Sequence, residues 1–325
     1  MTKKPELTLL YTIARSYYID KLSQSQIAEM ENISRSQISR LLDRAEKLGI
    51  VNIDVSLPED PDLSEMAESV TKLLGLREVI VAPLDGGADD PAAIAEAISV
   101  AAAQYLPRAL KGTKTVGLGW GKTMYNMSLR LSYRNLGDER VYVPLVGMSG
   151  TSNPYLQINT IVDRVAERHR ARSYFVSVPA FRELSSPFSE IEEQRMATLE
   201  QYWAHLDAAV IGLGRPPQSG GLFVDEISER CSAEVASCGA VGDILSYFFH
   251  PNGSMYHFGH AYRQVAFDIR RLHRVRKVIC LAGGPDKIEG IAAAARLKYF
   301  NSLVTDSVTA KTFYDQFRSG GVDRS

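Results

Sequence analysis

The sequence of 325 residues lacks several features that would assign it to a special class of protein. Its three cysteines, Cys231, Cys238 and Cys280, show no CxxC spacing, so no disulfide framework is expected and a reducing cytoplasm fits. Polar residues interrupt every apolar run well short of a membrane span, and the start, MTKKPELTLL, lacks the apolar core of a signal peptide. We therefore expect a cytoplasmic globular protein that does not enter a membrane.

An excess of basic charge is also missing. The formal net charge is −1, and residues 1–60 carry eight bases and nine acids, again a net charge of −1. Residues 34–49, by contrast, hold four bases and two acids, a net charge of +2. Any affinity for nucleic acid must therefore come from a local patch, which assembly into a dimer would double.

Residues 23–49 predict two short helices joined by a tight turn. Ser23 and Ser34 are each followed three residues later by a glutamine, which is the pattern of a capping box at the start of a helix. Gly49 suits the end of the second helix. An apolar face at helical spacing runs along that second helix and consists of Ile38, Leu41, Leu42, Ala45 and Leu48.

The opposite face of this second helix is rich in side chains that donate hydrogen bonds. Such side chains bind phosphates and base edges, and a helix-turn-helix presents them near the start of its second helix. An ordinary amphipathic helix pair with a solvated charged face has the same periodicity and remains the alternative. The expected DNA-binding residues are Ser34, Arg35, Ser36, Gln37, Arg40 and Arg44.

Three further segments complete the predicted domain organisation. Residues 6–20 predict a helix that packs on the other two, and residues 50–57 alternate like a strand. The acidic, proline-containing segment 58–64 has the composition of a linker. We therefore expect a helix-turn-helix DNA-binding domain at 1–57 and a ligand-binding domain at 65–325.

From residue 65 onward, apolar strands bounded by glycine alternate with amphipathic helices. This alternation predicts an α/β domain with a parallel, doubly wound sheet. Ligands of such sheets bind at the carboxyl ends of the strands. Four predicted strand ends carry small, donor-rich loops, which are GLGWGKT (117–123), GMSGTSN (147–153), GLGRP (212–216) and AGGPDK (282–287).

These loops expose backbone N–H groups beside helix starts, and two of them add a lysine, so together they favour a site for a phosphate or a hydroxyl-rich sugar. For any single loop, a glycine that merely closes a turn is the simpler explanation. The first loop does not match a nucleotide-binding P-loop, because Val116 stands where that motif needs glycine. A clean Rossmann fingerprint is absent as well, and no cofactor is expected.

A further stretch with a candidate ligand-binding residue is AVGDILSYFFHPNG (240–253), which contains Asp243. Its carboxylate could cap a helix or accept hydrogen bonds from ligand hydroxyls, and the two roles are compatible. His257 and His260 have an HxxH spacing without a clear third ligand, so no metal site is expected. Neither a Ser–His–Asp set nor a catalytic pair of carboxylates stands out, which argues against an enzyme.

Across nearly the whole chain, the sequence resembles the SorC family of bacterial sugar-responsive transcription regulators. The segment LSQSQIAEMENISRSQISRLLDRAEKLGIV is similar to that family's helix-turn-helix. GLGWGKTM, AVGDILSYFF and LAGGPDKIEGIAAAARLKYFNSLVTD are similar to its effector domain, and their order makes the resemblance specific. The resemblance implies a Rossmann-like effector domain related to sugar-phosphate isomerases, often tetrameric, that binds phosphorylated sugars.

The resemblance also implies roles for particular residues. It places Gly121 and Thr123 in the loop on the phosphate side, Asp243 in the GD motif and Lys287 in the GGxxK motif. One loop departs from the family, since residues 146–150 (VGMSG) stand where many members have a Gly-Gly pair. The expected effector-binding residues are Gly119, Gly121, Lys122, Thr123, Ser149, Gly150, Asp243 and Lys287.

We therefore expect a transcriptional regulator of a carbohydrate or polyol operon. Its expected partners are operator DNA, a small sugar phosphate or polyol, and further copies of the chain in a dimer or tetramer. A sugar-phosphate isomerase with a DNA-binding appendage is the alternative, and turnover of a sugar phosphate would reveal it. A helix-turn-helix used only for protein contacts would show no salt-dependent DNA binding.

Overall fold

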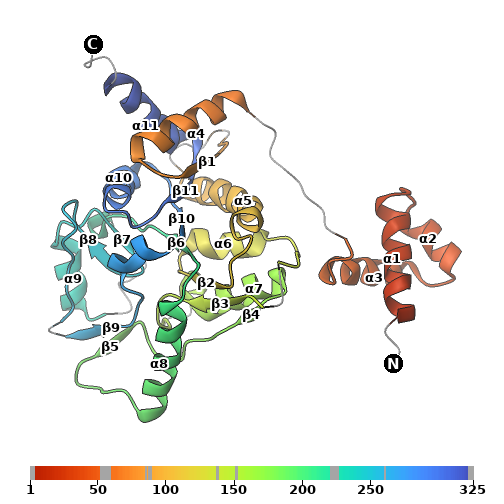
Figure 1. Cartoon of the computed structure of the whole chain (residues 1–325), viewed down its shortest axis with the longest axis horizontal. Helices are drawn as coiled ribbons and strands as arrows, with labels where there is room; N and C mark the ends of the chain where they lie inside the picture. The colour runs from red at the N-terminus through yellow and green to blue at the C-terminus, as the bar shows by residue number, and fades with distance from the viewer. Residues whose placement is uncertain are drawn as a thin grey trace.

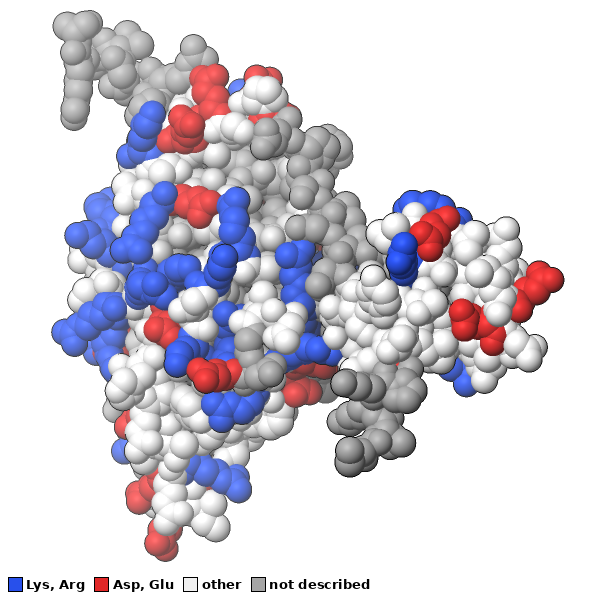
Figure 2. All heavy atoms as spheres, turned by 45° about the vertical axis from the view of Figure 1, so that its right-hand side comes forward, with Lys and Arg blue, Asp and Glu red and all other residues white. Residues whose placement is uncertain are grey.

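A computed structural model of the chain describes residues 4–51, 60–84, 86, 90–136, 139–150, 153–219, 227–259 and 261–320. These residues form two separate hydrophobic cores, one among the first three helices and one in a larger α/β domain. The three-helix module stands to one side of the α/β domain (Figure 1, Figure 2). Within the described ranges, no helix is both long and apolar enough to cross a membrane.

The module consists of α1 (Lys4–Tyr18), α2 (Gln24–Glu31) and α3 (Arg35–Lys47). Both predicted capping boxes are present, because Ser23 and Ser34 each accept a hydrogen bond from the backbone of the glutamine three residues on, and that glutamine's side chain bonds back. Asn32 turns the chain between α2 and α3 with a φ of 54°. The helix starts predicted from these local spacings are therefore confirmed.

The α/β domain is built on the predicted parallel sheet, which has seven strands in the order β1-β11-β10-β6-β2-β3-β4. From β2 the chain moves outward in one direction and from β6 in the other, so the strand order reverses between these two neighbours. The strands are β1 (Glu78–Ala82), β2 (Thr115–Leu118), β3 (Val141–Pro144), β4 (Arg172–Ser173), β6 (Ala208–Gly212), β10 (Lys277–Leu281) and β11 (Ser302–Asp306).

Helices cover both faces of this sheet, which is the doubly wound arrangement (Figure 1). Right-handed crossovers put α5, α6 and α7 on one face, because the connections from β1 to β4 all run in the same direction. The return connections put α8 and α10 on the other face, where α4 packs against α11. The helices are α4 (Pro61–Leu74), α5 (Pro91–Ala109), α6 (Lys122–Arg130), α7 (Ile158–His169), α8 (Glu190–Ala204), α9 (Glu229–Ser237), α10 (Ile288–Arg296) and α11 (Ser307–Gly320).

Two small antiparallel sheets accompany the main one. One pairs β5 (Phe181–Glu183) with β9 (Tyr262–Gln264), and the other is a hairpin of β7 (Gly242–Ile244) and β8 (Tyr247–Phe249). The 3-10 turns are η1 (Pro154–Leu156), η2 (Pro217–Ser219), η3 (Ile269–Arg274) and η4 (Pro285–Lys287).

The start of the α/β domain differs from the prediction. α4 begins at Pro61, inside the segment 58–64 that was expected to be a linker. The reason is that the Asp60 carboxylate accepts hydrogen bonds from backbone N–H groups of the first turn, and proline is favoured there. The strand expected at 50–57 falls almost entirely outside the described residues.

Ser34→Ala removes the side chain that accepts a hydrogen bond from the Gln37 N–H at the start of α3. We expect the module to lose about 0.5–2 kcal/mol of stability, which is the usual cost of an N-cap. Hydrogen exchange of the α3 amides in the full chain measures this loss apart from unfolding of the α/β domain. Ser34→Thr keeps the hydroxyl and is the control. Equal exchange rates in the two variants would show that the cap contributes nothing.

Candidate functional site

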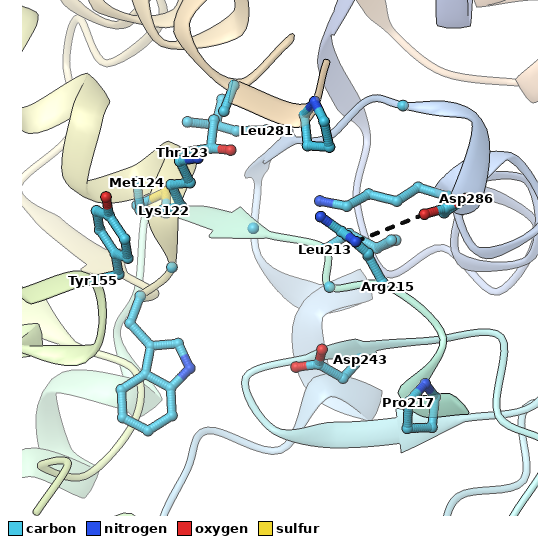
Figure 3. Close-up of a pocket in the computed structure, with 18 of the residues that line it drawn as sticks. Lys122, Thr123, Met124, Tyr155, Leu213, Arg215, Pro217, Asp243, Leu281 and Asp286 are labelled. Atoms are coloured by element: carbon cyan, nitrogen blue, oxygen red, sulfur yellow. Dashed lines mark ion pairs between the residues drawn. The ribbon is translucent and has the colours of Figure 1, made fainter. Parts of the chain in front are cut away.

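A cavity of about 1000 Å³ opens at the carboxyl ends of β2, β6 and β10. Three of the four loops predicted at strand ends line it, those at 117–123, 212–216 and 282–287. Because the strand order reverses between β2 and β6, this is the crevice in which open α/β sheets bind ligands. Side chains from separate elements converge on it (Figure 3).

Two helices begin at this cavity without a side chain that caps them. Gly121 precedes α6 with a φ of 119°, which favours glycine, and Lys287 precedes α10. Serine or aspartate side chains, in contrast, cap α2, α3, α4, α5, α8 and α9. The backbone donors at the start of α6 can therefore bind a ligand, and an anion is favoured there. At α10 the turn η4 already uses the N–H groups of Lys287 and Ile288, which bond the carbonyls of Gly284 and Pro285.

A buried hydrogen-bond network fixes the Gly-Gly turn that follows β10. Asp306, at the end of β11, accepts hydrogen bonds from the backbone and the hydroxyl of Thr309, and that hydroxyl accepts one from the Gly284 N–H at 2.7 Å. A Cβ on Gly283 would lie 2.0 Å from the Asp306 carboxylate, so only glycine fits. The network thus holds Lys287 at the wall of the cavity.

Asp243 lines the cavity from the hairpin of β7 and β8 (Figure 3). The helix-cap alternative for this residue is therefore wrong. Leu245 and Ser246 turn the chain with φ values of 51° and 67°, the left-handed conformations of a tight hairpin. Asp243 is 7% exposed and lies against Gly214, where an added Cβ would be 1.7 Å from Oδ1. Glycine is required at position 214 because the loop after β6 and strand β7 approach each other this closely.

Charges of opposite sign meet in this cavity. Burial raises the pKa of Asp243 to about 6, and the nearby Lys287 ammonium partly offsets that rise. Burial lowers the pKa of Lys287, although Asp243 is among the groups that oppose this. Arg215 adds a second cation, which pairs with Asp286 at 3.8 Å (Figure 3). The arrangement suits an anionic group beside the cations and hydroxyls beside Asp243.

The structure brings part of the expected effector-binding set to the cavity and leaves the rest away from it. Gly119 is not a lining residue, because its N–H bonds the Val210 carbonyl of β6. Ser149 and Gly150 are not lining residues either, because the chain just before them pairs with residues 178–180. The expected residues that line the cavity are Gly121, Lys122, Thr123, Asp243 and Lys287.

Several lining residues are not expected from the sequence, and Trp120, Tyr155 and Arg215 are among them. Arg215 and Trp120 lie within loops that the sequence does predict, and the charge of Arg215 between Gly and Pro is a signal that could have identified it. Tyr155 carries no such signal. It reaches the cavity through a tertiary contact, in which the Gly121 N–H bonds the Tyr155 carbonyl at 2.9 Å.

The polar residues at the start of α3 partly serve the helix itself. Gln37 Oε1 accepts hydrogen bonds from the Ser34 N–H and hydroxyl at 2.9 and 3.0 Å. The Ser36 hydroxyl lies 3.0 Å from that of Ser34. The side-chain NH2 group of Gln37 therefore remains for a contact outside the helix, and replacement of Gln37 would disturb the helix start as well as any base contact.

The arginines of α3 differ in whether they already form an ion pair. Arg44 forms an ion pair with Glu6 of α1 at 2.6 Å, so it helps to hold the module together. Arg35 and Arg40 are exposed, and neither forms an ion pair within the described parts of the chain. These two side chains are thus the strongest candidates for contact with DNA.

Metal-ligating and acidic side chains are sparse around the cavity. Within the ranges that the structure describes, no group of three or more His, Cys, Asp or Glu side chains is arranged to hold a metal ion. His260, of the HxxH pattern, lies outside those ranges. Among the described lining residues, the carboxylates are Asp243 and Asp286, and the latter pairs with Arg215.

Asp243→Asn removes a buried carboxylate whose pKa is about 6 in the folded protein. The folded state holds this proton more tightly than the unfolded chain does, so ionisation destabilises the ligand-free protein as pH rises through about 4 to 6. Urea unfolding should therefore find the variant more stable than wild type by roughly 1–3 kcal/mol near neutral pH, with the difference shrinking toward about pH 4. Asp163→Asn, at an exposed position of α7, is the control. A difference that does not vary with pH would contradict this account.

The chain matches known proteins over most of its length. A family model described as a sugar-binding domain matches residues 61–313. The sorbitol operon regulator of Klebsiella pneumoniae is 28% identical over 96% of this chain and 99% of its own length. The deoxyribonucleoside regulator of Bacillus subtilis is 28% identical over 92% of this chain and 94% of its own. The transcriptional regulator LsrR of Enterobacter sp. is 28% identical over 94% of this chain and 92% of its own.

The similarity extends to three-dimensional structure. The crystal structure of the full-length sorbitol operon regulator SorC from Klebsiella pneumoniae aligns with a TM-score of 0.68, covering 95% of this chain and 99% of that one at 28% identity. Because the family model covers most of the described α/β domain and the aligned structure extends over nearly the whole chain, the protein belongs to the SorC family of transcriptional regulators with a sugar-binding domain.

Proposed function

We propose that this protein is a cytoplasmic DNA-binding regulator of a carbohydrate or polyol operon, controlled by a small phosphorylated sugar or polyol. In this proposal α2 and α3 act as a helix-turn-helix within a domain at 1–57, and the chain from residue 60 onward is the effector domain. The relatives named for a sorbitol operon and for deoxyribonucleosides support this class of effector. We also propose that the protein acts as a dimer or tetramer, because residues 1–60 alone carry a net charge of −1.

The observation that carries the proposal is the divided character of the cavity. One part of it is suited to an anion, because Lys287, Arg215 and the uncapped start of α6 lie there. Asp243, which accepts hydrogen bonds when ionised, makes another part suited to hydroxyls. A sugar phosphate or polyol phosphate carries both kinds of group in one small molecule.

We propose binding without turnover. Isomerisation of a sugar phosphate needs a general acid and a general base within reach of the reacting carbons. Of the two carboxylates among the described lining residues, Asp286 is engaged with Arg215, which leaves Asp243 without a second acid–base group of its kind. Incubation of the pure protein with ribose 5-phosphate or glucosamine 6-phosphate tests this, and formation of an isomer would establish the enzyme instead.

Lys287→Ala and Asp243→Asn should separate the two ends of the effector. Loss of a hydrogen bond to a charged group costs about 1.5–3 kcal/mol, so we expect Lys287→Ala to weaken a hexitol phosphate roughly 10- to 100-fold and to leave the free hexitol nearly unchanged. Asp243→Asn should weaken both ligands. Calorimetric titration measures these affinities, and Lys72→Ala, at an exposed position of α4, is the matched control. If wild type binds and both cavity variants bind equally well, the divided cavity is not the effector site.

Arg40→Ala should impair the reading of operator DNA. An arginine that makes a bidentate contact to a base contributes about 1–3 kcal/mol of discrimination, so the variant should lose part of the preference for operator over random DNA. Arg44→Ala is the comparison on the same helix: it is already paired with Glu6 and should weaken both DNAs alike. Fluorescence anisotropy with both DNAs gives the ratio, and light scattering gives the assembly state. An unchanged ratio in Arg40→Ala would show that this residue does not read the operator.

A further inference from the structure

The amino edge of the parallel sheet, opposite to the cavity, is lined by basic residues. Arg77, Lys114, Arg140 and Arg276 stand directly before β1, β2, β3 and β10, and β4 begins with Arg172. Because parallel strands all start at the same edge, these residues lie along one edge of the sheet, where β6 and β11 are the strands of this sheet without a basic residue at their start. The α/β domain thus carries a row of positive charge that the cavity does not use.

Hydrogen bonds tie this amino edge into one surface. Arg77 donates to the carbonyl of Arg276 at 2.8 Å, and Arg276 donates to that of Gly112 at 3.4 Å, across from the end of α5. At the other end of the sheet, between β3 and β4, the Arg172 N–H bonds the Arg140 carbonyl at 2.9 Å, and the Arg140 side chain is itself buried. Backbone carbonyls of the connections before β10 and β2 therefore position the side chains of Arg77 and Arg276.

The carboxylates near the amino edge are already engaged. Glu139 pairs with Lys114 at 3.1 Å, and Glu78 pairs with Arg108 at 2.8 Å. The Asp207 carboxylate accepts a hydrogen bond from the Lys114 N–H at 2.7 Å. Several exposed cations near this edge form no ion pair within the described ranges. They are Arg77, Lys111, Arg172, Arg274 and Arg276.

The positive charge at this edge also affects the pKa of a partly buried lysine. Burial lowers the pKa of Lys277, the first residue of β10, and the guanidinium groups of Arg276 and Arg140 lower it further, against the opposing charge of Glu78. Neighbouring cations of one sign raise the local potential and attract a polyanion. The edge therefore has excess positive charge for an external partner to neutralise.

This edge meets the C-terminal end of α3. Arg170, two residues before β4, donates from Nε and Nη2 to the carbonyl of Lys47, the last residue of α3, at 3.2 and 3.0 Å. Figure 2 shows that lysine and arginine side chains outnumber the carboxylates interspersed among them on the face of the α/β domain that is seen beside the module. Basic charge thus continues from the end of α3 onto the edge of the sheet.

We propose that the amino edge of the sheet is a second DNA-contacting surface, which binds the phosphates that flank the bases read by α3. The inference rests on the proposed function, since it needs α3 to dock on an operator. From β4 to β10 the edge crosses four strand spacings, roughly 20 Å, which is the length of about six base pairs. Neutralised phosphates over this distance would extend the site beyond the reach of one recognition helix.

The distribution of charge favours DNA as the partner of this edge. Residues 1–60 have a net charge of −1, so the three-helix module alone attracts a DNA duplex only weakly. The charged groups of an effector have their partners in the cavity at the opposite ends of the strands. If the edge bound an acidic protein instead, removal of its cations would leave the salt dependence of DNA binding unchanged. The test below therefore distinguishes these two partners.

The test is the triple variant Lys111→Ala, Arg172→Ala and Arg274→Ala in the full chain. These side chains are exposed and form no ion pair with described residues, so their loss leaves the fold intact. Each phosphate contact contributes about 0.9 to the slope of log affinity against log salt concentration. We expect the slope to flatten by about 1 for each of the three cations that contacts DNA, equally for operator and random DNA. Hydroxyl-radical footprinting should show lost protection in the flanking base pairs.

The control removes three cations elsewhere, by Arg195→Ala, Arg230→Ala and Lys311→Ala on α8, α9 and α11. This variant should keep the slope and the footprint of wild type. Equal flattening in both variants would show an effect of total charge and overturn the proposal, as would an unchanged slope in the edge variant or a change in its assembly state by light scattering. Failure of wild type itself to bind operator would refute the proposed function, whereas the other outcomes bear on the edge alone.

Discussion

A buried carboxylate and a partly buried ammonium share one cavity, and much of the α/β domain serves to hold them there. Burial raises the pKa of Asp243 and lowers that of Lys287, so the ligand-free cavity is an unfavourable place for both charges. The same loss of solvent strengthens hydrogen bonds to a ligand that supplies the missing partners. Gly214 and Gly283 allow the close backbone approaches that place these charges, since a Cβ at either position would collide with a carboxylate.

How far the sequence predicts this structure depends on the range of the interactions involved. The capping boxes of Ser23 and Ser34 follow from spacing alone, because each is complete within four residues. The meeting of three glycine-rich loops follows from parallel topology, which brings strand ends to one edge. These features are local, or are fixed by fold class, and the predictions for them are confirmed.

The features that the sequence does not predict depend on contacts between distant segments. Asp243 is in a hairpin whose turn, Leu245–Ser246, lacks the Asn or Gly that usually signals one. Ser149 and Gly150 are kept from the cavity by pairing with a segment some thirty residues on, at 178–180. The ion pair of Arg44 joins α3 to α1. In each case, the residue type is compatible with several roles, and tertiary structure selects one.

Control of DNA binding by an effector would require coupling between the two opposite edges of the sheet. A ligand can change DNA affinity only if it binds two arrangements of the protein with different affinities. The cavity lies at the carboxyl edge, and α3 meets the α/β domain at the amino edge through Arg170. Elements that run from one edge to the other are the ones able to couple them. α5 is such an element, because Ile94 and Ile98 in its first turns line the cavity, while the chain that leaves its last turn accepts the hydrogen bond of Arg276. Its nineteen residues span about 28 Å as one helix, so it physically connects the cavity to the amino edge.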